Sequence, residues 1–131
     1  MKMQNCVVSI EGWQMKCCGT PFKIGDRVKW TVCKEKLEDG VDYAYEHHGQ
    51  AKEPFTLTGN VSEIEARYDR GELRPSPYCE NAQITYMVYV KSIDVTEADG
   101  WDNDIDDLRF GDYVVTLLDC VLEPEGAAPA E

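Results

Sequence analysis

The sequence predicts a mainly β protein, a small barrel of five to six strands with long loops. Several runs alternate apolar and polar residues with a period of two, and segments rich in glycine and proline separate these runs. No segment shows the apolar period of a long helix. A closed or partly closed barrel is the economical arrangement of such strands, because closure removes unpaired strand edges.

In the N-terminal part, the sequence predicts two strands with turns between them. Residues 6–10 form a short apolar run, which predicts the first strand. Residues 13–30 read W-Q-M-K-C-C-G-T-P-F-K-I-G-D-R-V-K-W and contain turn signals at 19–21 and at 25–26. A half-buried strand follows over 27–33, and the side chains on one of its faces are Val28, Trp30 and Val32.

The middle of the chain is less regular. Residues 34–53 are polar, and we expect a long loop there, with one helical turn around 43–47. Residues 55–68 fit a strand with a bulge near Gly59 or Ser62, and they also fit a helix capped by Asn60. The strand is favoured because the segment begins F-T-L-T-G-N-V, which suits extended chain.

The C-terminal part predicts two more strands. Residues 70–81 contain Pro-Ser-Pro and predict a rigid extended loop. Residues 84–95 are apolar on both faces, which indicates a central strand or one whose second face is covered. Residues 97–107 hold six acids and no base, as expected of a solvated loop, and the last strand is expected over 110–122. We therefore assign residues 1–123 to a single domain and residues 124–131 to a disordered tail.

Two resemblances bear on the fold. The succession F-K-I-G-D-R-V-K-W, L-T-G-N-V-S-E-I and Y-M-V-Y-V resembles the strand rhythm of SH3-like barrels, and an OB-like barrel fits nearly as well. The phrases W-Q-M-K-C-C-G-T-P-F-K-I-G-D-R-V-K-W and Y-E-H-H-G resemble the signature of an uncharacterised bacterial family, a domain of unknown function. That resemblance implies one recurrent domain and no particular activity.

The charge balance excludes several classes of partner. The chain has 25 acids and 13 bases, for a net charge of −12. Nucleic-acid binders need cations to neutralise phosphates, so we expect no nucleic acid and no anionic membrane as partner. The N-terminus lacks the apolar core of a signal peptide, so we expect a cytoplasmic protein whose six cysteines are thiols.

A cysteine pair and a histidine pair suggest a possible zinc or thiol site. Cys17, Cys18, His47 and His48 supply the thiolate and imidazole ligands of a tetrahedral zinc ion. The spacing is poor, because adjacent side chains in extended chain point to opposite sides. A cysteine nucleophile with a histidine base is also conceivable, but no oxyanion hole is evident. Catalysis is therefore not favoured, and the cysteines can equally be small packing residues.

Aromatic residues suggest a binding surface instead. The candidates for such a surface are Trp30, Tyr43, Tyr45 and Trp101. Most of these are expected in the core, but Trp101 lies among acids and should be partly exposed. The function that we expect is a protein- or ligand-binding module, and the alternative is the zinc or thiol site.

Overall fold

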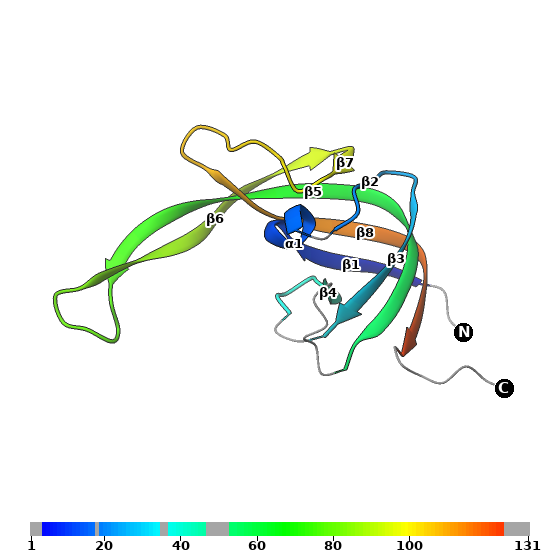
Figure 1. Ribbon diagram of the computed structural model, residues 1–131, viewed down its shortest axis with the longest axis horizontal. Coiled ribbons are helices and arrows are strands. Elements are labelled where there is room, and N and C mark those ends of the chain that lie inside the picture. The colour runs from blue at the N-terminus through cyan, green and yellow to red at the C-terminus, as the bar shows by residue number, and fades with distance from the viewer. Residues whose placement is uncertain (1–3, 18, 35–36, 47–52, 125–131) are drawn as a thin grey trace.

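The structure, a computed structural model, describes residues 4–17, 19–34, 37–46 and 53–124 (Figure 1). It has eight strands and one helix in these residues. In chain order they are β1 (Gln4–Glu11), α1 (Gly12–Cys17), β2 (Phe22–Lys23), β3 (Arg27–Cys33), β4 (Tyr43–Tyr45), β5 (Phe55–Pro75), β6 (Gln83–Val95), β7 (Glu97–Ala98) and β8 (Arg109–Pro124). The helix is too short and too polar to span a membrane.

Six strands form one sheet in the order β3-β4-β1-β8-β5-β6, while β2 and β7 pair separately. Because β3 also pairs with β5, five of the six strands close into a ring. The mainly β class predicted from the sequence is therefore confirmed. Figure 1 shows the ring at one end of the molecule, with α1 lying against it.

The inner face of the ring is the hydrophobic core. Along β1 the buried positions alternate with exposed or half-buried ones, as a strand with one covered face requires. The same alternation runs along β8, where Tyr113, Val115 and Leu117 are fully buried. On β3, Trp30 and Val32 are buried as the period of two predicted.

The longest strand, β5, connects the parts of the sheet because it pairs with β3, β6 and β8. Its register against β8 shifts between Thr58 and Asn60 and again between Val61 and Glu63. The bulge expected near Gly59 or Ser62 is thus confirmed, and the helical alternative is wrong. A Cβ atom on Gly59 would lie 3.0 Å from the Cys120 Sγ atom, so β8 packs closely against this point.

Two expectations for the β5–β6 region are wrong. Residues 70–75 belong to β5 and are not a loop, because they pair in register with the first half of β6. The strand β6 lies at the end of the sheet and is not central. Beyond the ring, β5 and β6 continue as a two-stranded arm (Figure 1). Most residues of β6 are exposed, so its apolar faces are not covered by the ring.

Two local expectations are also corrected. Residues 12–17 form α1, where the sequence suggested only a turn. Residues 43–45 form β4 instead of a helical turn, because Tyr43 pairs with Val8 of β1 and Tyr45 pairs with Val32 of β3. Of the predicted tail, Pro124 ends β8, and residues 125–131 lie outside the described part of the chain.

Candidate functional site

The predicted zinc or thiol residues fall largely outside the described residues. Cys17 is the last residue of α1, and its side chain is exposed. Cys18, His47 and His48 lie outside the described part of the chain, so the two pairs remain a prediction. Within the described residues, no group of three or more His, Cys, Asp or Glu side chains is placed to hold a metal ion.

Three other cysteines lie in the core. Cys6, Cys33 and Cys120 are buried. Burial raises the pKa of the Cys6 thiol and, with the neighbouring Cys6, raises the pKa of Cys120 to about 12. A thiol with so high a pKa carries almost no thiolate at neutral pH, and the thiolate is the reactive form. We therefore assign Cys6 and Cys120 to packing.

The predicted aromatic surface divides into two parts. Trp30, Tyr43 and Tyr45 are buried in the core. Trp101 is 66% exposed, as expected, and the Lys16 ammonium group lies 5.1 Å from its ring centroid. The structure therefore brings Trp30 and Tyr45 together, at 5.6 Å between ring centroids, whereas Trp101 belongs to a separate surface loop.

A groove lies beside β3, with Trp30 and Tyr45 in its lining. Its volume is about 510 Å³, within the usual range of roughly 300–1,000 Å³ for ligand sites. Phe22 adds a third ring, 5.0 Å from that of Trp30. Polar groups from Asp26 and Lys29 also line it. We call this hollow the β3 groove.

The β3 groove follows an open strand edge. On one side β3 pairs with β5 along Arg27–Val32. On the other side its described neighbour, β4, pairs only with Val32 and Cys33. A hydrogen bond from the Glu46 N–H to the Thr31 carbonyl extends this contact by one residue. Residues 27–30 therefore have no strand partner on this side in the described part of the chain, and we call them the open edge.

The corner that leads into the open edge is held firmly. Gly25 has a φ of +96°, which a residue with a side chain rarely adopts. The Gly25 N–H donates to the Val61 carbonyl, and the Val61 N–H donates to the Asp26 carbonyl, each at 2.8 Å. The Asp26 carboxylate accepts from the Lys23 N–H at 3.0 Å. These hydrogen bonds fix the corner beside the groove.

The groove lies in the most basic part of an acidic chain. Residues 13–34 hold five bases and one acid, against 13 bases and 25 acids in the whole chain. The Arg27 and Lys29 side chains are exposed, since they alternate with the inward Val28 and Trp30. Across the sheet they lie opposite Asn60 and Thr58, which are uncharged. The outer face of the open edge therefore favours negative groups.

A second charged cluster lies on the outside of the ring and is structural. The Arg67 guanidinium donates to Glu38 at 2.6 Å and to Asp112 at 2.5 Å. The hydrogen bond to Arg67 lowers the pKa of Glu38. Burial, and then the charge of Asp112, raises the pKa of Asp69. Arg67 of β5 thus binds Glu38 and Asp112 of β8 together, so the cluster fastens the segment around Glu38 to β5 and β8.

The acidic loop is likewise fixed by hydrogen bonds. The Tyr113 hydroxyl donates to Asp102 at 2.5 Å and accepts from the Gly100 N–H at 3.0 Å. Asp104 accepts from the Phe110 N–H at 3.0 Å. Burial, and then the hydrogen bond to Asp102, raises the pKa of Tyr113. These carboxylates hold the loop against the ring.

The sequence did not identify Phe22, Arg27 and Lys29 as site residues. The signal for the two bases was present, because the concentration of bases in 13–34 is visible by counting charges along the chain. The open edge itself had no signal, since it depends on how few residues of β4 reach β3.

Comparison with known proteins gives one match. The model of a family of unknown function (DUF6578) matches residues 4–119. No curated protein and no solved structure matches the chain. The match agrees with the resemblance to an uncharacterised domain that the sequence motifs carried.

Proposed function

The chain belongs to a family of unknown function, DUF6578, and we propose that it is a protein-binding module that takes an extended, acidic peptide segment along the open edge of β3. The observation that carries the proposal is the open edge itself, residues 27–30, beside the β3 groove. A peptide that pairs with a strand edge gains affinity from main-chain hydrogen bonds and specificity from alternate side chains.

The strand geometry predicts the pattern of the bound segment. Residues that lie opposite each other on paired strands point to the same face of the sheet. Peptide residues opposite Arg27 and Lys29 would therefore point outward, where acidic side chains pair with these bases. Peptide residues opposite Val28 and Trp30 would point to the same face as the Trp30 ring, where apolar side chains are favoured. We therefore expect acidic residues to alternate with apolar ones.

The length of the edge limits the size of the contact. Four residues of strand span about 13 Å at roughly 3.3 Å per residue. A segment of this length buries little area, so the interaction is a transient one of the kind that short recognition motifs make.

The free thiol state expected of the cysteines suits a reducing compartment, and we place the protein in the cytoplasm. No disulfide joins the cysteines that the structure describes.

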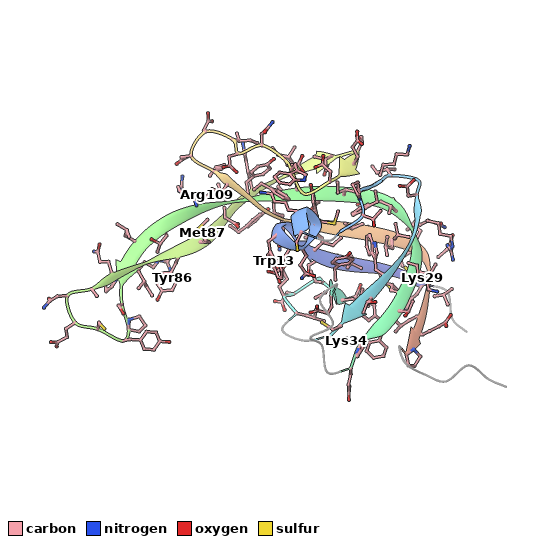
Figure 2. The ribbon with its side chains drawn as sticks, viewed as in Figure 1. Trp13, Lys29, Lys34, Tyr86, Met87 and Arg109 are labelled. Atoms are coloured by element: carbon pink, nitrogen blue, oxygen red, sulfur yellow. The ribbon has the colours of Figure 1, made fainter. Side chains whose placement is uncertain are left out.

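Selection from a displayed library of random linear peptides tests the proposal. We expect the wild-type protein to enrich sequences in which acids alternate with apolar residues. Lys29→Glu should abolish the enrichment, because it places a negative charge on the outer face of the open edge. Lys34→Glu is the matched control, since Lys34 follows the end of β3 that β4 covers (Figure 2). It changes the net charge equally and should leave the enrichment in place.

Three results would overturn this function. Enrichment of sequences without acids would show that the bases of the open edge are not used. Equal loss of binding in both lysine variants would show that net charge matters and position does not. Failure of the library to enrich any sequence with the wild-type protein also counts against a peptide-binding module.

A further inference from the structure

A second surface, distant from the β3 groove, is an unpaired edge of a different kind. The arm, which we define as residues 70–90, is the part of β5 and β6 that extends beyond the ring (Figure 1). The strand β6 pairs with β5 on one side and ends the sheet on the other. Its outer backbone groups therefore face away from the described part of the chain.

The arm is unusually apolar for an exposed feature. Its two faces carry six exposed large apolar side chains. They are Leu73, Tyr78, Ile84, Met87, Tyr89 and Val90. A long, flat, apolar strand edge is a template for pairing with another strand, and soluble proteins normally interrupt such edges with charges or proline. Residues 83–90 of β6 contain neither.

The charge distribution indicates which partner pairs with this edge. The arm holds two acids and two bases, so it is neutral, whereas the whole chain has a net charge of −12. Two copies of the chain repel each other over most of their surfaces, because both carry the same large charge. They meet without that repulsion only where the local charge is balanced. The arm is such a region.

The sequence of β6 is also complementary to itself. We propose that two copies of the protein form a twofold dimer in which their β6 edges pair antiparallel around Met87. In this register Tyr86 lies opposite Val88 of the second copy, and Thr85 lies opposite its Tyr89. Each pair is uncharged, and aromatic residues opposite β-branched ones stabilise antiparallel sheets. The two short arms then become one continuous four-stranded sheet.

The dimer explains why the arm is ordered as a strand pair. An isolated two-stranded hairpin is marginally stable in water, and at least three strands or a packed face are needed for independent stability. In the described part of one chain, Arg70–Pro75 pair only with the first half of β6. Pairing with a second copy supplies the additional strands. The β3 groove has no part in this contact, so dimerisation and peptide binding are separate properties.

Molar mass in solution tests the dimer. Light scattering on the full chain should give twice the 14.9 kDa of one chain. Met87→Lys and Met87→Glu should each give monomers, because Met87 lies opposite its own copy and like charges then meet at the axis. Met87 is 51% exposed, so neither change removes core packing. An equimolar mixture of the two variants should restore the dimer, which unfolded chains would fail to do.

Leu73→Lys is the matched control. Leu73 is 68% exposed and lies on the same face of the arm, opposite Thr85, but on β5 and away from the edge. Leu73→Lys should therefore leave the dimer intact. Loss of the dimer in Leu73→Lys would show that the arms stack by their faces and would overturn the edge pairing. A monomeric wild type, a dimer that survives both Met87 variants, or open-ended aggregation would overturn it as well.

Discussion

The indole ring of Trp30 meets the ring of Tyr45 edge-on, with 5.6 Å between centroids and 85° between planes. The contact joins β3 to β4 at the place where the two strands pair over only two residues. Edge-to-face pairs add roughly 0.5–1.5 kcal/mol to the energy of burial. The side chains that close the ring are thus the same ones that line the β3 groove.

Replacing Trp30 should destabilise the protein far more than replacing Trp101. We expect Trp30→Ala to lower the free energy of unfolding by about 3–5 kcal/mol, because Trp30 is buried between two rings. Trp101→Ala should cost about 0.5–1 kcal/mol, the size of its cation–π contact with Lys16. Urea unfolding measures both. Equal losses would show that Trp101 is a core residue after all.

Two glycines with similar backbone angles should respond differently to alanine. Gly100 has a φ of +86°, and a Cβ atom there would lie 2.8 Å from the backbone nitrogen of Lys16. Gly40 has a φ of +83° with open space around it. Gly40→Ala should cost about 1 kcal/mol for its backbone angle alone. Gly100→Ala should cost at least about 2 kcal/mol, because the close contact adds to that cost.

The measurement is thermal or urea unfolding of the two glycine variants side by side. The difference between them isolates the contact of the acidic loop with α1, since the backbone strain is common to both. If Gly100→Ala were as mild as Gly40→Ala, the loop would not lie against the helix.

The charge of Asp69 should make stability depend on pH. Its folded-state pKa is raised by burial and by Asp112, so the stability it contributes is present at low pH and lost as the pH rises through that pKa. Asp69→Asn should therefore raise the free energy of unfolding at pH 7, by less than about 1 kcal/mol.

The gain in stability of Asp69→Asn over the wild type should disappear in acid. Below the ordinary pKa of aspartate, 3.8, Asp69 is protonated in both the folded and the unfolded protein, so wild type and Asp69→Asn should become equally stable. Urea unfolding at several pH values between about 3 and 7 covers this window. If the stability gained by Asp69→Asn grew as the pH falls, the raised pKa of Asp69 would be contradicted.

The thiols should separate into two classes on labelling. Cys79 lies at the exposed tip of the arm and should react with an alkylating reagent in the folded protein. Cys6 and Cys120 are buried with raised pKa values and should react only after unfolding. Peptide mass spectrometry assigns the labelled positions. Modification of Cys120 in the native protein would show that β8 separates from its neighbours.

Much of the ring could be predicted from sequence because its strands have one covered face. The alternation of Val28, Trp30 and Val32 predicted β3, and the phase shift around Gly59 predicted the bulge in β5. The arm could not be predicted in the same way. Apolar residues on both faces of β6 indicated burial, whereas the structure places the strand at the sheet edge.

The short elements depended on tertiary contacts. The strand β4 has only three residues, and hydrogen bonds to Val7 and Thr31 hold the residues on either side of it in place. No local propensity marks such a strand. The helix α1 is similar, because the buried Gln14 side chain donates to the Tyr45 carbonyl at 3.3 Å and fastens it to β4. The open edge exists because β4 is short, so the site could not be located from sequence.

Amide hydrogen exchange along β3, measured residue by residue by NMR, tests the proposed peptide site most directly. The probe is a peptide in which glutamate alternates with valine, and its counterpart with lysine in place of glutamate is the control. We predict that the glutamate peptide slows exchange at alternate amides within Arg27–Trp30, because a paired strand protects every second N–H on an edge. The lysine peptide should not. Unchanged exchange at these four residues with saturating glutamate peptide, or equal protection by both peptides, would contradict the account.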